Sequence, residues 1–285
     1  MFNSTEGRTA RNPRIMKVLM CPPTYFSIDY EINPWMDKSN IVDKEAAQKQ
    51  WEGLVDTYKN LGVEVKTINP VENLPDMVFT ANAGLVIPAS PAGRDKKVIL
   101  ASFLYPERRP ESSYFENWFA KEGYKVIKMD QDAYFEGRGE ALWLGNRLVV
   151  GYGFRANLAG HRELRKYLGE SLVSVKIVDP RFYHLDTCFL PLDHNAAAYY
   201  PSAFDPKSRE KLIGLIPDLL EVSKEDALAF ACNSVVVGRK IVMPAGAREL
   251  PKKLQSLGYE VISLDISEFK KSGGGVRCLT LDLES

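Results

Sequence analysis

The stretch MVFTANAGLVI, residues 77–87, is a short apolar segment that carries one amide, Asn82, among small residues. Four further segments of this kind, each an expected strand bearing polar side chains, follow along the chain. They are YFEGRGEALWL at 134–144, HLDTCFLPL at 184–192, ACNSVVV at 231–237 and VRCLTL at 276–281. The steps between them are all about fifty residues, a period typical of repeat architectures that close on themselves. In a closed ring such strands would converge on the axis, and their polar residues would share one central pocket.

Helical and strand patterns alternate between these segments, which predicts the α/β class. Strands are expected at residues 17–20, 63–68, 77–87, 97–101 and 125–129, and helices at 44–61 and 111–122. Residues 1–14 lack periodicity and are expected to form a disordered leader. No low-complexity linker divides residues 15–285, so we expect a single domain there.

The composition argues against several classes of function. The 285 residues include 37 Lys+Arg and 37 Asp+Glu, so no net charge attracts nucleic acid or an anionic membrane. No window holds the roughly eighteen apolar residues of a membrane helix, and no signal peptide is expected. The four cysteines lie far apart, without the spacing of a disulfide framework or a zinc site. We therefore expect a cytoplasmic protein without a metal; its oligomeric state is left open.

Cys278 follows three glycines, in the stretch SGGGVRCLTLD at residues 272–282. Because glycine allows the backbone to approach a ligand closely, a thiol at this place suits a nucleophile. The alternative is a buried cysteine in a C-terminal strand. Burial is also the expectation for Cys21, Cys188 and Cys232.

His184 and Asp186 would share one face of a strand, since side chains at i and i+2 point the same way. An imidazole beside a carboxylate is a tuned acid or base, and a hydrogen-bonded strand end is the alternative. Glu136 begins EGRGE, whose glycines permit close approach of a ligand but lack the spacing of a dinucleotide fingerprint, so no cofactor is expected. The structural alternatives to a role in the site are that Glu136 is exposed to solvent in a glycine-rich turn and that Asn82 caps the backbone.

Arginines stand at Arg108, Arg109 and Arg155, the last directly after GYGF. Guanidinium groups bind carboxylates through two parallel hydrogen bonds, and a plain surface charge is the alternative for each. A cysteine with a histidine could serve acyl transfer, as in a protease or amidase. The additional carboxylates instead favour a planar, cationic substrate centre with many N–H donors. Guanidinium fits that description, and arginine would bring an α-carboxylate for the arginine side chains.

Five motifs resemble the guanidine-modifying family of arginine deiminases, dimethylarginine dimethylaminohydrolases and amidinotransferases. They are PDMVFTAN ending at Asn82, FEGRGE from Phe135, GYGFR ending at Arg155, HLDT from His184 and GGVRC ending at Cys278. The resemblance covers about residues 17–283 and implies a five-bladed α/β propeller of ββαβ modules, with residues 15–285 as one catalytic domain.

The resemblance also implies roles for individual residues. Cys278 would be the nucleophile and His184 the general acid and base, while Glu136 and Asp186 would bind the guanidinium nitrogens. The substrate α-carboxylate would be held by Arg108 and Arg155, although Arg109 could replace Arg108.

Position 82 departs from the deiminase pattern, because deiminases and dimethylaminohydrolases carry an aspartate where this chain has Asn82. Asparagine there, with MCPPTYF from Met20 and YEINPWM from Tyr30, is similar to the arginine dihydrolases. Those enzymes convert arginine to ornithine, ammonia and carbon dioxide. The same similarity implies that Asn33 lines the pocket, and residues 26–39 are the segment expected to close over it.

The expected function is therefore an arginine dihydrolase that acts on arginine through a citrulline intermediate. The alternatives are an arginine or methylarginine deiminase that stops at citrulline, and an amidinotransferase that passes the amidino group to an amine. An alternative hypothesis outside the enzymes is a catalytically silent module that binds amino acids. It is disfavoured by the intact set of Cys278, His184 and Glu136, and a neutral amidase is disfavoured by the surplus of charged groups.

Overall fold

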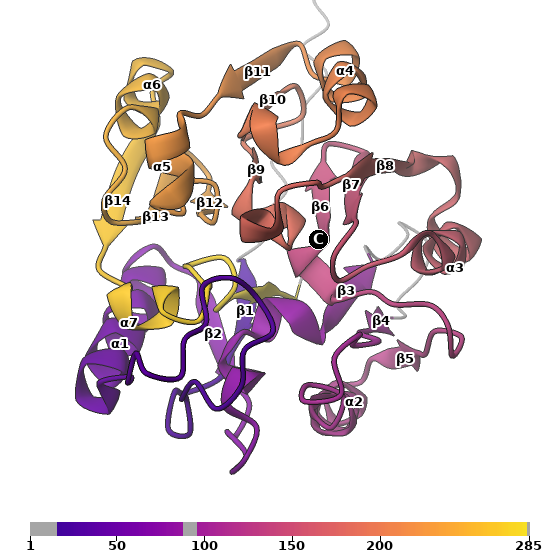
Figure 1. Ribbon diagram of the computed structural model, residues 1–285, viewed down its shortest axis with the longest axis vertical. Helices are drawn as coiled ribbons and strands as arrows, with labels where there is room; N and C mark the ends of the chain where they lie inside the picture. Colours follow the sequence, from indigo (N-terminus) through magenta and orange to yellow (C-terminus); the bar gives the residue numbers. More distant parts are fainter. Residues whose placement is uncertain (1–15, 88–95, 284–285) are drawn as a thin grey trace, which may run out of the picture.

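The computed structural model describes residues 16–87 and 96–283. Its strands form five sheets of three strands each, and each sheet combines one antiparallel with one parallel pair. The five units surround a common centre, with helices α1, α2, α3, α4 and α6 at the periphery (Figure 1). This is the five-bladed α/β propeller of ββαβ modules that the repeat and the resemblance predict.

Each unit runs strand, strand, helix, strand. The second consists of β3 (Gly84–Ile87), β4 (Lys97–Leu100), α2 (Glu111–Lys121) and β5 (Lys125–Ile127). The third consists of β6 (Ala141–Leu144), β7 (Arg147–Tyr152), α3 (Leu158–Leu168) and β8 (Leu172–Lys176). The fourth consists of β9 (Phe189–Pro191), β10 (Ala196–Tyr199), α4 (Pro206–Leu215) and β11 (Asp218–Glu221). The fifth consists of β12 (Val235–Val237), β13 (Lys240–Pro244), α6 (Leu250–Ser256) and β14 (Glu260–Leu264).

The first unit is assembled from both ends of the described chain. It contains β1 (Lys17–Met20), α1 (Lys44–Asn60), β2 (Glu64–Thr67) and the late strand β15 (Leu281–Asp282). β15 pairs antiparallel with β1, and β1 pairs parallel with β2. The ring is thus completed by a strand that comes 214 residues after β2 ends, from Thr67 to Leu281. Two short helices, α5 (Lys224–Leu228) and α7 (Ser267–Lys270), lie in the connections.

Apolar side chains fill the spaces between neighbouring sheets. Trp51, Leu54 and Tyr58 of α1 are buried in one cluster with Val235 and Val242 of the fifth sheet. Equivalent clusters join the other neighbouring units. No helix of the described residues is long and apolar enough to cross a membrane.

The predicted elements match the structure except near the axis. The strand expected at 17–20 is confirmed, and the helices expected at 44–61 and 111–122 each end one residue earlier. The strands expected at 63–68, 97–101 and 125–129 are shorter, at Glu64–Thr67, Lys97–Leu100 and Lys125–Ile127. The leader expected at residues 1–14 lies outside the described residues.

The prediction that the polar residues stand on strands is wrong. Residues Pro75–Val78 and Thr80–Ala83 form two 3₁₀ turns before β3 begins, and Leu185–Thr187 forms another before β9. His184 and Asp186 therefore do not share the face of a strand. Hydroxyl and amide side chains stabilise such turns by bonding to the nearby backbone, as Thr187 Oγ1 does to the His184 carbonyl at 2.6 Å.

Thr80 ties the turn before β3 to both ends of the ring. Its buried hydroxyl lies 2.8 Å from the Leu19 carbonyl and 3.1 Å from the Leu279 carbonyl. Thr80→Val keeps the shape but leaves both carbonyls without this donor, so we expect a loss of about 1–3 kcal/mol in the free energy of unfolding, measured by urea denaturation. The control is Thr57→Val, whose exposed hydroxyl bonds only within α1. Equal losses in the two variants would refute the role of Thr80 in closure.

Candidate active site

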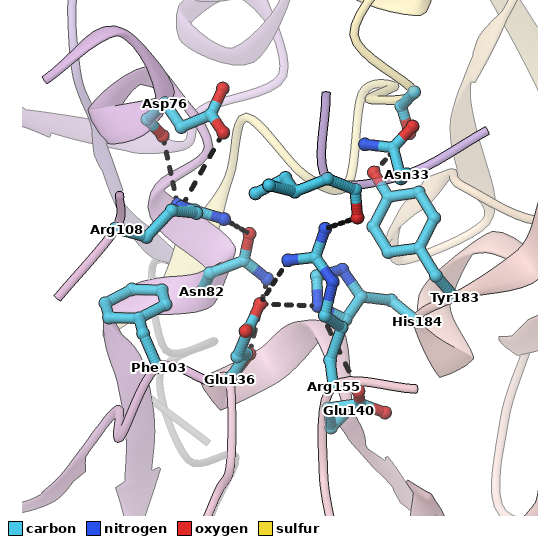
Figure 2. A network of polar contacts seen from close by, with 12 residues as sticks. Asn33, Asp76, Asn82, Phe103, Arg108, Glu136, Glu140, Arg155, Tyr183 and His184 are labelled. Carbon is cyan, nitrogen blue, oxygen red and sulfur yellow. Dashed lines mark hydrogen bonds and ion pairs between the residues drawn. The ribbon is translucent and has the colours of Figure 1, made fainter. Parts of the chain in front are cut away.

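Glu136 lies at the centre of a buried polar network (Figure 2). Its Oε2 accepts a hydrogen bond from Arg155 Nη1 at 3.0 Å and lies 2.9 Å from His184 Nε2. Burial works against the charge of the Glu136 carboxylate, but Arg155 and His184 outweigh it and hold its pKa at about 2. Burial lowers the pKa of His184 to about 4, against the opposing effect of Glu136. The pair therefore consists of a carboxylate and a neutral imidazole, an arrangement suited to acid–base chemistry.

The side chain of Cys278 contacts the carboxylate of Asp186 and the amide of Asn233. Its thiol is 3.5 Å from Asp186 Oδ2, and Asn233 Nδ2 donates to Sγ at 3.1 Å. Asn233 Oδ1 also accepts from the backbone N–H of Cys278 at 3.1 Å, so this amide holds both ends of the residue. Burial, with the nearby Asp186, raises the pKa of the thiol well above its ordinary value. Burial also raises the pKa of Asp186 to about 7.

The expected pairing of His184 with Asp186 is therefore not what the fold produces. His184 contacts Glu136, whereas Asp186 contacts Cys278. The 3₁₀ turn after His184 rotates the two side chains away from a common face, which strand geometry would have given them.

Asn82 connects Arg108 to Glu136. Arg108 Nη1 donates to Asn82 Oδ1 at 2.8 Å, and Asn82 Nδ2 donates to the backbone carbonyl of Glu136 at 3.2 Å (Figure 2). A side chain at Gly139 would collide with this amide, since an added Cβ would lie 2.4 Å from Asn82 Nδ2. The Asn82 amide is thus oriented by its surroundings and is not a simple backbone cap.

Arg108, and not Arg109, belongs to the network. Arg108 makes a bidentate pair with Glu111, with both contacts at 2.8 Å, and donates to the carbonyl of Asp76 at 3.1 Å. Arg109 instead bonds to the carbonyls of Phe103 and Leu104 in a more exposed position. Burial raises the pKa of Glu111 to about 7 even though Arg108 pulls it down.

The segment at residues 26–39 is tied to the site at three points. Its Ile32 carbonyl accepts from Arg155 Nη2 at 3.0 Å, and Asn33 Nδ2 donates to the Ser272 carbonyl at 3.1 Å. Trp35 Nε1 donates to the carbonyl of Arg181 at 2.8 Å, and its ring packs against Phe230. The cysteine, histidine and carboxylates are at most 2 % exposed, so a ligand enters only if a covering segment moves.

Several carboxylate oxygens of the site have no hydrogen-bond partner among the described residues. They are Glu136 Oε1, Asp186 Oδ1, Asp76 Oδ1 and both oxygens of Glu140. Burial together with the charges of Glu136 and Asp186 raises the pKa of Glu140 well above its ordinary value. Such unpartnered buried acceptors fit a planar cation with several N–H donors. Within the described part of the chain no cluster of His, Cys, Asp and Glu is arranged to hold a metal ion.

Sequence reasoning missed Asn233, Asp76, Glu111 and Glu140 as members of the site. Asn233 had a usable signal, because it occupies the fourth repeat segment where the other repeats place Asn82 and Asp186. The remaining three are carboxylates in turns or at helix starts, where a solvated side chain is the ordinary expectation.

The family described as eukaryotic N,N-dimethylarginine dimethylhydrolase matches residues 22–284. The chain belongs to this family. It is thereby a member of the guanidine-modifying superfamily that the sequence motifs resemble, and the match agrees with the geometry of the site.

Two curated relatives are similar along nearly the whole chain. The N(G),N(G)-dimethylarginine dimethylaminohydrolase of Mycobacterium tuberculosis is 41% identical over 96% of this chain and 87% of its own length. The bifunctional arginine dihydrolase/ornithine cyclodeaminase ArgZ of Synechocystis is 42% identical over 93% of this chain. This chain corresponds to 37% of the length of ArgZ.

Solved structures agree with the fold. The N-terminal domain of ArgZ, described as an arginine dihydrolase from cyanobacteria and bound to substrate, has a TM-score of 0.89 at 41% identity. The similarity covers 95% of this chain and 98% of that domain. A dimethylarginine dimethylaminohydrolase adduct with a TM-score of 0.79 is only 22% identical and supports the fold alone.

The contact of Asn233 with Cys278 predicts the reactivity of the thiol. Asn233→Ala removes a donor that favours the thiolate, and hydrogen bonds to charged groups contribute about 1.5–3 kcal/mol. Alkylation of Cys278 by iodoacetamide should therefore slow by about tenfold or more at neutral pH. Peptide mass spectrometry measures the rate, and Asn157→Ala, which removes the N-cap of α3 far from the thiol, is the control. An unchanged rate would contradict a role for Asn233.

Proposed function

We propose that this protein is an arginine dihydrolase that converts L-arginine to L-ornithine, two ammonia and carbon dioxide. Cys278 is the nucleophile, His184 the general acid and base, and Glu136 the partner that orients His184 and binds the substrate. The observation that carries the proposal is Asn82, an amide held between Arg108 and Glu136 in a site of otherwise guanidine-binding character. The similarity to ArgZ supports it.

Substrate binding completes the charge balance of the site. The guanidinium of arginine would donate to the unpartnered oxygens of Glu136 and Asp186. Its positive charge beside Cys278 favours the thiolate, which burial disfavours in the free protein. The nucleophile is thus activated when the cationic substrate arrives, with the thiol proton passing to His184.

The first round then proceeds by covalent catalysis. The thiolate adds to the guanidinium carbon, and His184 protonates the departing ammonia, leaving an amidino-thioether on Cys278. His184 next removes a proton from water, which attacks the same carbon. The C–S bond breaks, the thiolate is restored, and citrulline is formed.

A second round uses the same groups on citrulline. The thiolate adds to the ureido carbon and ammonia leaves, so a thiocarbamate links the ornithine nitrogen to Cys278. Water releases a carbamate, which loses carbon dioxide to give ornithine. For the same thiolate to act in both rounds, citrulline must stay bound after the first round.

Asn82 is suited to retain citrulline. One of its Nδ2 hydrogens is engaged by the Glu136 carbonyl, and the other is available to the ureido oxygen. An aspartate would present only acceptors to both of these oxygens.

Arg108, Arg155 and Asn33 are proposed to hold the amino-acid end of the substrate. Arg155 could exchange the Ile32 carbonyl for the substrate α-carboxylate, which would couple binding to movement of the covering segment. Arg108 already uses Nε, Nη2 and one hydrogen of Nη1, so a single Nη1 hydrogen remains for a carboxylate. Arg155 therefore carries most of this role.

The runner-up is a dimethylarginine dimethylaminohydrolase or arginine deiminase, which would release citrulline. The family match and the 41% identity to the mycobacterial relative favour this candidate. An amidinotransferase is a weaker candidate, because it needs an acceptor amine in place of water. The ligands are small molecules in every case, and a cytoplasmic location stays a prediction.

Product analysis tests the proposal and the role of Asn82 together. Incubation with arginine should yield ornithine and two ammonia per arginine, and incubation with citrulline should yield ornithine and one. Asn82→Asp should make citrulline accumulate and lower the ornithine yield by about tenfold or more, because the second attack loses its donor. Amino-acid analysis and an ammonia assay measure both.

Asn82→Ala is the matched control for charge at this position. It should also accumulate citrulline, since it too lacks the amide donor. Citrulline as the end product of the wild-type protein would select the deiminase, and dimethylarginine turnover would select the dimethylaminohydrolase. Unchanged ornithine yield in Asn82→Asp would refute the role of the amide.

The raised pKa of Asp186 predicts how substrate binding depends on pH. Below about pH 7 the carboxyl is protonated in the free protein, so binding of a guanidinium requires that it first lose a proton. The affinity of the Cys278→Ser variant for arginine should fall by up to about tenfold for each pH unit below 7, measured by calorimetry. Asp186→Asn should bind more weakly at neutral pH and show a flatter profile. A profile that is the same in both proteins would contradict this assignment.

A further inference from the structure

A cavity of about 150 Å³, with both apolar and charged residues in its lining, lies next to the candidate active site. It is lined by residues of the inner strands β6, β9, β12 and β15 and by the side chains of Arg138 and Arg277. Asn233 and Cys278 belong to the active site, whereas their sequence neighbours Ser234 and Arg277 line this cavity. The two sites therefore lie back to back along the same chain segments.

The cavity carries an excess of buried positive charge. Arg277 forms a bidentate pair with Asp282, at 3.2 and 2.7 Å, and Arg138 Nη2 contacts the same carboxylate. All three residues are at least nine-tenths buried, with 7 %, 6 % and 7 % of Arg138, Arg277 and Asp282 exposed. Two guanidinium groups thus share one carboxylate in direct contact, and Asp186 acts on both of them from farther away. Because burial raises the pKa of Asp186 to about 7, this second carboxyl balances only part of the remaining positive charge near neutral pH, so the cluster favours a further negative charge.

The unpartnered polar atoms of this cluster are all donors. Among the described residues, Arg138 Nε and Nη1 and Arg277 Nε have no hydrogen-bond acceptor. Trp143, which lines the same cavity, has an unpartnered Nε1. This is the reverse of the active site, whose unpartnered atoms are mainly carboxylate oxygens. Burial lowers the pKa of Arg138 to about 10, with Asp282 opposing and Arg277 adding to the effect.

We propose that this cavity binds a small inorganic anion between Arg138 and Arg277. Unpartnered N–H donors, and two guanidinium groups in contact with one carboxylate, suit a single monovalent anion and not a cation. The cavity, of about 150 Å³, is large enough for chloride or bicarbonate. The evidence for this anion site does not rest on the proposed reaction, although Arg277 and Arg138 also act electrostatically on Asp186 of the candidate active site.

Anion-dependent stability tests the site on the full chain. Sodium gluconate, whose anion is too bulky for the cavity, is exchanged for sodium chloride or sodium bicarbonate at constant ionic strength and pH. The melting temperature of the wild-type protein should rise saturably, by about 3 °C or more at concentrations far above the dissociation constant. Chloride and bicarbonate in separate titrations distinguish the two anions.

Three variants connect the effect to this cavity. Arg138→Gln leaves the neutral Arg277–Asp282 pair intact, so the anion-dependent shift should disappear. Asp282→Asn raises the net positive charge, so half-saturation should require about tenfold less anion. Arg109→Gln changes an arginine outside the cavity and should keep the wild-type shift.

A direct binding measurement covers the case in which a variant fails to fold. The ³⁵Cl NMR line of chloride should broaden with the wild-type protein, and bicarbonate should sharpen it by competition. No saturable broadening and no saturable shift in the melting temperature would overturn the proposal. So would equal anion effects in the wild-type protein and Arg138→Gln.

Discussion

The pairing of β15 with β1 is the constraint on which the site depends. This pairing returns the end of the described chain to its beginning, at Val18 with Asp282 and Leu19 with Leu281. It places the turn that carries Cys278 beside the turns that precede the fourth and fifth units, so the thiol meets Asp186 and Asn233. Thr80 reinforces the closure by bonding to carbonyls on both sides. Without the closed ring, groups 92 residues apart in the chain would have no common site.

Burial of charge is the second theme of the structure. The site buries Glu136, Asp186, Glu140, Asp76 and Glu111 against two arginines, and several of the carboxylate oxygens have no partner within the described residues. This burial raises the pKa of Asp186 and of Cys278. In the proposed mechanism a bound guanidinium would relieve the cost of burying these charges, so that selectivity for a cation and activation of the thiol would have one physical origin.

The candidate active site and the cavity lined by Arg138 and Arg277 use the same framework for opposite charges. Residues adjacent in the chain, such as Asn233 and Ser234 or Cys278 and Arg277, contribute to different sides. One side gathers acceptors and the other gathers donors. A fold of repeated turns around an axis makes this division easy, because adjacent residues of a turn point to different places.

Local sequence signals were enough to predict the five-fold repeat, the α/β class and most outer elements, because these depend on periodicity and on helix signals such as those at residues 44–60. The motifs also identified the family, and they named Cys278, His184, Glu136, Asn82, Asp186 and Arg155, which the structure brings together in the candidate site. Only the tertiary structure decided the pairings, giving Glu136 rather than Asp186 to His184 and Asn233 to Cys278. It also selected Arg108 over Arg109. Which side chains contact each other depends on the backbone rotation in each 3₁₀ turn and on packing by units that are distant in the chain. Neither of these leaves a periodic pattern in the sequence.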